Sequence, residues 1–153
     1  MSSRVKENDI EIAAATWADL DAIHRLEASS FPSPWRREFF ESELSGESRL
    51  HFVARRRGSV VGYVFAMWFF DEMHVNKIAV LESERRKGIA DTLMERCLEF
   101  ARDNGITTIS LEVRQSNRGA QAFYEHLDFA ALYLRPRYYP DGEAAVVMVR
   151  ELG

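Results

Sequence analysis

The stretch Arg85-Arg86-Lys87-Gly88-Ile89-Ala90 lies between an extended apolar segment and the most strongly amphipathic helical pattern of the chain. The first N–H groups of a helix have no partner within it, and the helix dipole adds partial positive charge there. Gly88 lets a ligand approach the backbone closely, and three cationic side chains precede it. The stretch therefore predicts a binding site for a pyrophosphate. For so short a motif, the simpler alternative is a solvated basic turn.

Two other phosphate-binding motifs are missing from the sequence. It contains neither G-x-x-x-x-G-K-[ST] nor G-x-G-x-x-G. The first motif is typical of Walker loops and the second of dinucleotide-binding folds. Both explanations of the basic turn are therefore excluded.

Periodicity on either side of the turn indicates alternating helices and strands. Apolar residues recur at helical spacing from Ile89 to a stop at Gly105, and alternate through the strand 107–113. Thr16 and Asp19 resemble a capping box, and Pro34 after Ser33 suggests a second helix start. Extended segments are expected at 10–15, 50–55, 60–70, 73–80, 107–113, 129–134 and 144–149, and helices at 17–29, from 34, at 89–104 and around 120–127. This order predicts an α/β (α+β) fold with a mixed, mostly antiparallel central sheet flanked by helices.

Length and composition limit the class of protein. With 153 residues, 46% of them hydrophobic, the chain is expected to form a flexible tail at 1–8 and a single domain at 9–153. The net charge of -4 argues against nucleic acid or an anionic membrane as partner. The single Cys97 and the absence of an apolar leader suggest a cytoplasmic protein. The four histidines are scattered, so no metal site is expected.

The basic turn also resembles a known signature. Arg85-x-x-Gly88-x-Ala90 is similar to the Gln/Arg-x-x-Gly-x-Gly/Ala motif with which GNAT acetyltransferases hold the pyrophosphate of coenzyme A, with Ala90 where Gly is commoner. The segment 76–80 resembles the strand of that family whose backbone pairs with the pantetheine arm. The resemblance implies a GNAT fold and acetyl-CoA or CoA as cofactor. The cofactor contacts that it implies are Ile78, Ala79, Val80, Arg85, Arg86, Lys87, Gly88, Ile89, Ala90, Asp91, Asn117 and Tyr124.

Within this family the chain is most similar to N-terminal acetyltransferases. The segments that carry this likeness are 33–35, 111–114, 116–117, 122–125 and 137–140. It implies transfer of acetyl to a protein's N-terminal α-amine, such as the alanine of a small-subunit ribosomal protein. A lysine or small-molecule acetyltransferase and a non-catalytic CoA-binding module are the alternatives. The oligomeric state stays open.

Two residues are candidates for proton transfer. Alternation along 107–113 places Glu112 on the side of the sheet opposite Leu111, and the resemblance makes it a general base acting through water. The alternative for Glu112 is a surface charge linked to Arg114. The resemblance makes Tyr124 the general acid at the thioester sulfur. The alternative is that Tyr124, like Phe123, is a core aromatic.

Aromatic residues are candidates for the peptide entrance. The resemblance places two aromatic segments on either side of it, and their rings can form a narrow slot. The alternative is that some, Trp35 and Tyr139 above all, pack into the core. The residues assigned to the substrate are Phe31, Pro34, Trp35, Tyr138 and Tyr139.

Overall fold

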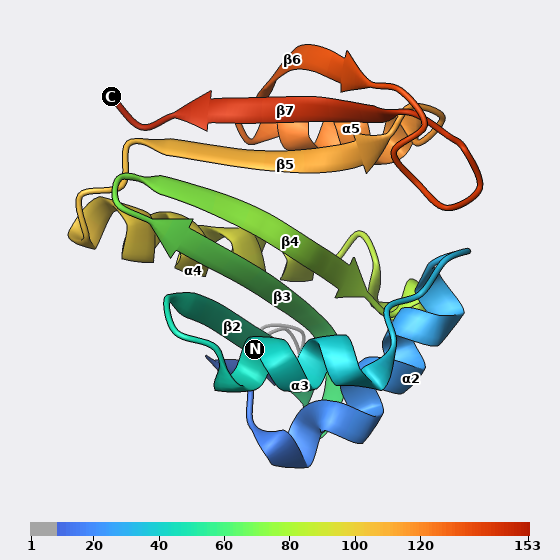
Figure 1. The fold of residues 1–153 in the computed structure, drawn as a ribbon. Helices are drawn as coiled ribbons and strands as arrows, with labels where there is room; N and C mark the ends of the chain where they lie inside the picture. The colour runs from blue at the N-terminus through green and yellow to red at the C-terminus, as the bar shows by residue number, and fades with distance from the viewer. Residues whose placement is uncertain (1–8) are drawn as a thin grey trace.

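The computed structural model describes residues 9–153, so the tail expected at 1–8 lies outside the described residues. A seven-stranded sheet in the order β1-β2-β3-β4-β5-β7-β6 forms its centre (Figure 1). The strands are β1 (Ile10–Ala14), β2 (Arg49–Arg56), β3 (Ser59–Phe69), β4 (Glu72–Val80), β5 (Thr108–Arg114), β6 (Ala130–Arg135) and β7 (Ala145–Glu151). The helices are α2 (Leu20–Ser30), α3 (Arg37–Ser45), α4 (Ile89–Asp103) and α5 (Arg118–His126), with short 3-10 turns at Trp17–Asp19 and Glu82–Glu84.

This order confirms the predicted α/β class and the mostly antiparallel sheet. Every neighbouring pair is antiparallel except β4 and β5. The expected capping box forms, because the Asp19 carboxylate accepts from the Thr16 backbone N–H at 2.9 Å and closes the first turn. Ile109, Leu111 and Val113 are buried while the residues between them are half-buried, as the alternation predicted.

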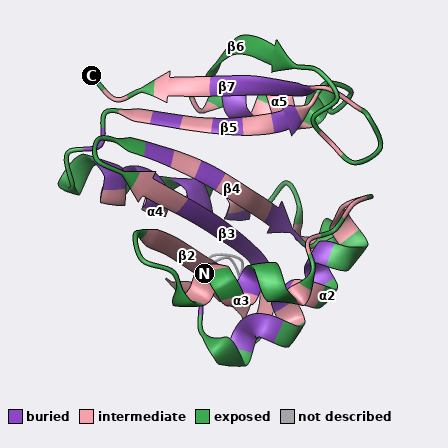
Figure 2. Ribbon diagram, in the orientation of Figure 1, coloured by how far each residue is buried: buried purple, intermediate pink, exposed green. Residues whose placement is uncertain are grey.

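Two helical layers cover the sheet. Helices α4 and α5 pack on one face and α2 and α3 lie across the other (Figure 1), so the core divides into two clusters. Along β3 the side chains alternate between them: Val64 and Ala66 pack toward α4, and Tyr63 and Phe65 toward α2. Figure 2 shows β3 buried over most of its length and the edge strand β6 exposed throughout.

A β-bulge in β4 reverses this alternation. Lys77 pairs with Phe65 and Val75 with Ala66, which leaves Asn76 without an opposite residue. Val75 therefore packs in the α4 cluster, whereas Ala79 packs in the α2 cluster. The bulge places the consecutive residues Asn76 and Lys77 both on the sheet face that α2 and α3 cover, where His74 already lies by alternation.

Strands β4 and β5 pair over a short distance and then separate. Their parallel register runs from Glu72 opposite Thr108 to His74 opposite Ser110. Beyond these residues the two strands diverge, as Figure 1 shows. The opening lies between the carboxyl-terminal halves of two central strands, where side chains from both can meet.

The second helix start was predicted wrongly. Helix α3 begins at Arg37 with Arg36 at its N-cap, rather than at Pro34 with Ser33 as the cap. The backbone N–H of Trp35 donates to the buried carboxylate of Glu27 at 2.8 Å. This bond to α2 occupies the backbone before α3, so the helix starts after it.

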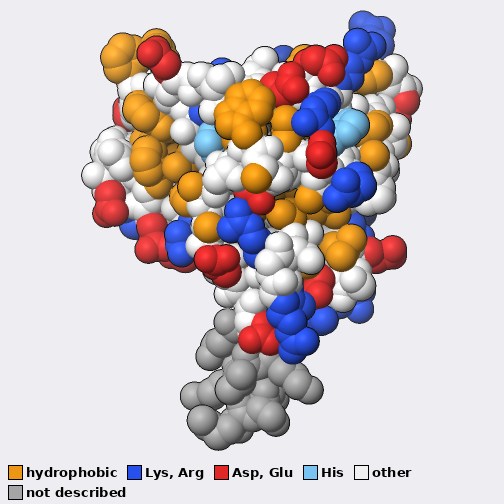
Figure 3. Space-filling view, turned by 90° about the horizontal axis from the view of Figure 1, so that it is seen from below, with side chains coloured by type: hydrophobic (Ala, Val, Ile, Leu, Met, Phe, Trp, Pro, Cys, Tyr) orange, Lys and Arg blue, Asp and Glu red, His pale blue; other side chains and the backbone are white. Residues whose placement is uncertain are grey.

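The surface carries mixed charge. On the face in Figure 3, side chains of Lys and Arg intermingle with those of Asp and Glu. Among residues 9–153, no helix is long and apolar enough to cross a membrane.

Candidate active site

A cleft of about 800 Å³ lies where β4 and β5 separate. Its floor comes from residues 74–78 of β4 and 111–114 of β5, and Tyr124 of α5 lines it. One wall is the segment between α2 and α3, and the other is the β6–β7 loop. Of the residues predicted from the sequence, it brings together Phe31, Trp35, Ile78, Glu112, Asn117, Tyr124, Tyr138 and Tyr139.

Glu112 is bound to a histidine that the sequence reasoning passed over. Its Oε1 lies 2.6 Å from Nε2 of His74, across the gap between β5 and β4. Its Oε2 lies 3.9 Å from Nη1 of Arg135 on β6. Arg114, the partner considered from the sequence, instead pairs with Asp141 and Glu143. Glu112 is thus one half of a carboxylate–imidazole pair inside the cleft.

The surroundings of this pair favour its charged form. Burial by itself raises the pKa of Glu112, but the hydrogen bond and charge of His74, with Arg135, outweigh it and hold that pKa below its usual range. Burial by itself lowers the pKa of His74, but hydrogen bonds to Glu112 and Asn76 outweigh it and raise that pKa. The two groups are joined by a hydrogen bond and each shifts the pKa of the other, so they titrate as a pair.

Tyr124 reaches the same cleft from α5. It is 8% exposed and packs edge-on against Phe123 and Phe129. Burial, with a smaller contribution from Tyr139, raises the pKa of its phenol. Tyr124 is therefore protonated at neutral pH, and it both packs in the core and lines the cleft.

A buried ion pair supports the first wall of the cleft. Glu27 of α2 is fully buried and binds Nζ of Lys77 at 3.1 Å, and it also accepts from the Tyr63 hydroxyl. The Lys77 ammonium lies 3.7 Å from the centre of the Phe31 ring. Together with the bond from Glu27 to the Trp35 backbone, these contacts hold two aromatic rings at the cleft. Pro34 is exposed and lies outside its lining.

Arg114 holds the second wall. Its Nη1 bonds Asp141 and Glu143 at 2.8 Å each, and its guanidinium lies 4.2 Å from the centre of the Tyr139 ring. Tyr138 packs edge-on against Tyr139. Burial raises the pKa of Tyr139 to about 12, so its phenol is uncharged at neutral pH. The β6–β7 loop is thereby fixed to β5 beside Glu112.

The basic turn forms at the end of β4, outside the lining of the cleft. Gly88 has a φ of +82°, a left-handed conformation that glycine adopts without strain, and α4 begins at the next residue. Within residues 9–153, the backbone N–H groups from Arg86 to Asp91 have no backbone acceptor. A Cβ on Gly88 would meet nothing within 4 Å, so the turn is open. These free donors fit a pyrophosphate.

Close packing positions this turn against the sheet. Gly62 of β3 faces Ile89 and Leu93 of α4, and a Cβ there would lie 3.3 Å from both side chains. Arg85 directs its Nε to the carbonyl of Val80 at 3.1 Å, so this predicted cofactor contact also braces the turn. Val80 and the neighbouring Ala79 are themselves buried.

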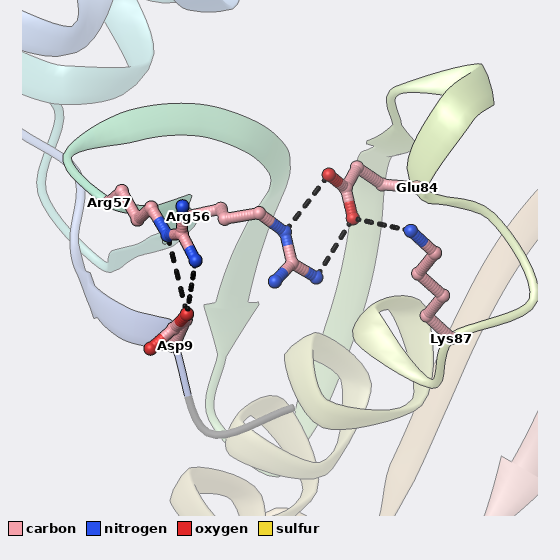
Figure 4. A network of polar contacts seen from close by, with 5 residues as sticks. All are labelled: Asp9, Arg56, Arg57, Glu84 and Lys87. Carbon is pink, nitrogen blue, oxygen red and sulfur yellow. Dashed lines mark hydrogen bonds and ion pairs between the residues drawn. The ribbon is translucent and has the colours of Figure 1, made fainter. Parts of the chain in front are cut away.

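An acidic residue beside the turn is neutralised by two cations (Figure 4). Arg56 of β2 makes two bonds of 3.0 Å to the carboxylate of Glu84, and Lys87 lies 3.4 Å from the same carboxylate. Arg57 binds Asp9 nearby at 3.2 Å. The bidentate Arg56–Glu84 pair ties the β2–β3 hairpin to the turn and offsets a negative charge that would oppose phosphate.

The sequence reasoning missed His74, Glu27 and Lys77. A signal was available for His74, because His74, Asn76 and Glu112 are polar residues within two segments predicted to be strands. Glu27 gave no signal, since one acid on an amphipathic helix is usually solvated. Cys97 is fully buried in the core.

Known proteins share this architecture and much of the sequence. Residues 20–129 match the Acetyltransferase (GNAT) family. The chain is 36% identical to the N-alpha-acetyltransferase of Saccharolobus solfataricus, over 99% of both chains. It is 33% identical to the [ribosomal protein bS18]-alanine N-acetyltransferase of Escherichia coli, over 90% of this chain and 94% of that one. The crystal structure of the Escherichia coli ribosomal-protein-S18-alanine N-acetyltransferase superposes with a TM-score of 0.87 at 31% identity, covering 94% of each chain. The family match spans the open turn and both strands of the cleft, so the chain belongs to the GNAT family of acetyltransferases.

Proposed function

We propose that this enzyme transfers an acetyl group from acetyl-CoA to the N-terminal α-amine of a protein. The observation that carries the proposal is the His74–Glu112 pair, which lies in a cleft that Tyr124 also lines. A proton acceptor and a proton donor thus line one space. The relatives named above, which act on N-terminal amines, support this substrate class.

The open turn is our candidate for the coenzyme A phosphates. Within the described part of the chain, the N–H groups of residues 86–91 have no backbone acceptor, and they lie at the positive end of the α4 dipole. Arg86 and Lys87 are exposed beside them. Asn117 already accepts from the Ala120 N–H at 3.0 Å through its side-chain oxygen, so its amide NH₂ is the group left for a ligand. When bound, acetyl-CoA supplies a thioester whose acetyl carbonyl an amine can attack.

Glu112 and His74 then act on the amine. An α-amine with a pKa near 8 costs about 1 kcal/mol to deprotonate at neutral pH, whereas a lysine near 10.4 costs about 4 to 5 kcal/mol. A carboxylate whose pKa lies below its usual range is a weak base, which suits the α-amine better. Glu112 takes the proton, directly or through a water molecule.

Tyr124 acts at the other end of the transfer. Its hydroxyl stays protonated because burial raises its pKa. It can therefore donate a proton to a departing thiolate, whose own pKa is near 8.5. Tyr124 ends the transfer as the proton donor, and Glu112 begins it as the acceptor.

The two walls select the peptide. Phe31 and Trp35 on one side and Tyr138 and Tyr139 on the other leave a slot for an extended chain end. We propose a small first residue such as alanine, and a small-subunit ribosomal protein as one substrate. A protein N-terminus is the only partner that this proposal requires.

The test is an assay of thiol release with acetyl-CoA and a peptide that begins Ala-Arg. The matched control is the same peptide with its N-terminus already acetylated. The proposal expects thiol release and a gain of one acetyl group with the free peptide alone. Equal release with both peptides would place the transfer on another amine. CoA binding with no turnover on peptides, lysines or small amines would indicate a binding module.

A further inference from the structure

Asn76, the bulged residue of β4, joins the reacting pair to helix α3. Its Nδ2 lies 3.0 Å from Oε1 of Glu43, and its Oδ1 contacts Nδ1 of His74. The other oxygen of Glu43, Oε2, accepts from Nε of Arg49 at 3.1 Å. The side chain of Glu43 is 13% exposed, so water competes little for these bonds.

The chemistry of these groups fixes the orientation of the Asn76 amide. A carboxylate only accepts hydrogen bonds, so the NH₂ group of Asn76 must face Glu43. Its carbonyl oxygen must then face His74. Nδ1 of His74 therefore lies against an acceptor, and Nε2 lies against a second acceptor, the Glu112 carboxylate.

We propose that Glu43 is a positioning residue for acetyl transfer: it orients Asn76 so that both ring nitrogens of His74 face acceptors and the imidazole is held as a cation beside Glu112. The inference rests on the proposed function for its catalytic meaning. The hydrogen-bond relay itself does not depend on that function. Helix α3, one support of the substrate wall, is thereby coupled to the base.

The other charged groups near His74 do not remove this effect. Arg135 of β6 opposes a cation at His74, and Glu112 of β5 favours it. Tyr138 of the β6–β7 loop is a neutral phenol next to Glu112. Asn76 differs from these groups because its amide can face His74 in either of two orientations, and Glu43 decides which one it takes.

The substitution Glu43→Gln reverses the relay without changing its shape. Arg49 can only donate hydrogen bonds, so the side-chain carbonyl oxygen of Gln at position 43 accepts from Arg49. The NH₂ group of that Gln then faces Asn76. Asn76 then turns its own NH₂ toward Nδ1 of His74. The imidazole can now be neutral, with its single proton on Nε2.

The experiment is a pH titration of ¹⁵N-histidine-labelled protein without cofactor, in which NMR monitors the chemical shifts of the imidazole nitrogens. The chain has four histidines, and a His74→Asn sample assigns the signal. Glu43→Gln is expected to lower the His74 midpoint by about one pH unit, as for loss of a charge-assisted hydrogen bond. The alkaline limb of the kcat/KM profile, along which the His74 cation is lost, should move the same way. Glu41→Gln, which removes a half-exposed acid from the same helix, should leave the midpoint unchanged.

Asn76→Ala separates orientation from charge. It should lower the midpoint with Glu43 intact, and adding Glu43→Gln to it should then change nothing further. The inference would be overturned if Glu43→Gln left the His74 midpoint unchanged. It would also be overturned if adding Glu43→Gln to Asn76→Ala lowered that midpoint further. Failure of the wild-type enzyme to acetylate any amine would instead remove the proposed function and leave the titration result standing.

Discussion

His74 and Glu112 are hydrogen-bonded across the point where the central sheet opens, with Nε2 and Oε1 2.6 Å apart. The two residues belong to neighbouring parallel strands that are paired only up to His74 and Ser110. The separation that forms the cleft therefore also brings the base to its floor.

Replacing the base should reduce catalysis without affecting cofactor binding. Glu112→Gln keeps the size of the side chain but cannot take a proton, so kcat/KM should fall by about 10² to 10⁴. The dissociation constant for CoA, measured by calorimetry, should stay near the wild-type value because the open turn is untouched. Wild-type turnover would remove Glu112 from this role.

Loss of the Tyr124 hydroxyl should affect kcat more than KM. Tyr124→Phe retains the packing against Phe129 but removes the proton donor, so kcat should fall at least about tenfold. Tyr133→Phe on the exposed strand β6 is the matched control, with unchanged steady-state kinetics. Equal effects of the two substitutions would contradict the assignment.

The open turn can be tested with a pair of glycines that share one conformation. Gly88 and Gly58 have φ values of +82° and +85°, and a Cβ would meet nothing within 4 Å at either. Alanine at each position should cost about 1 kcal/mol of unfolding free energy through backbone strain. Only Gly88→Ala should also weaken CoA binding in a titration. Equal CoA affinities would place the phosphates elsewhere.

The Glu27–Lys77 pair should matter for stability. Glu27→Gln leaves a largely buried ammonium without its counter-charge, which should lower the free energy of unfolding by about 3 kcal/mol. Glu99→Gln, an exposed acid of α4, should change it by less than about 0.5 kcal/mol. Chemical denaturation followed by circular dichroism measures both. A small loss in Glu27→Gln would show that the pair is not needed to hold the wall.

The reacting pair also predicts how stability depends on pH. The pKa of Glu112 is lowered on folding, so its contribution is present above the unfolded pKa of about 4.3 and is lost as pH falls through the folded value. The pKa of His74 is raised, so its contribution is present below about 6.5 and is lost as pH rises through the folded value. The stability difference between wild type and His74→Ala should therefore peak between these values. Urea unfolding at several pH values from about 4 to 9 measures this difference in the free energy of unfolding. A difference that stays constant over that range would contradict the pairing.

The sequence predicted features that depend on local pattern. Alternation placed Glu112 opposite Leu111, and helical spacing identified α4 and its glycine start. It could not predict His74 as a partner of Glu112, because the two are 38 positions apart and meet only through the parallel pairing of β4 and β5. The bulge at Asn76 likewise depends on the pairing of β4 with β3, in which Lys77 lies opposite Phe65. The late start of α3 depends on the hydrogen bond that the Trp35 backbone N–H donates to Glu27.

The assignment of Pro34 shows the same limit. Its place directly after Ser33 is a typical helix-start signal, yet the backbone N–H of the next residue, Trp35, bonds to Glu27 of α2. Phe31 and Trp35 still line the cleft, because Lys77 and Glu27 hold that segment against β4.

The choice of amine is the most direct test of the central claim. A single peptide with a free N-terminal alanine and an internal lysine would be incubated with acetyl-CoA and the wild-type enzyme, and tandem mass spectrometry would locate the added acetyl group. Acetylation of the α-amine, with the lysine unmodified, is the predicted result. Acetylation of the lysine, or of neither amine, would contradict the account.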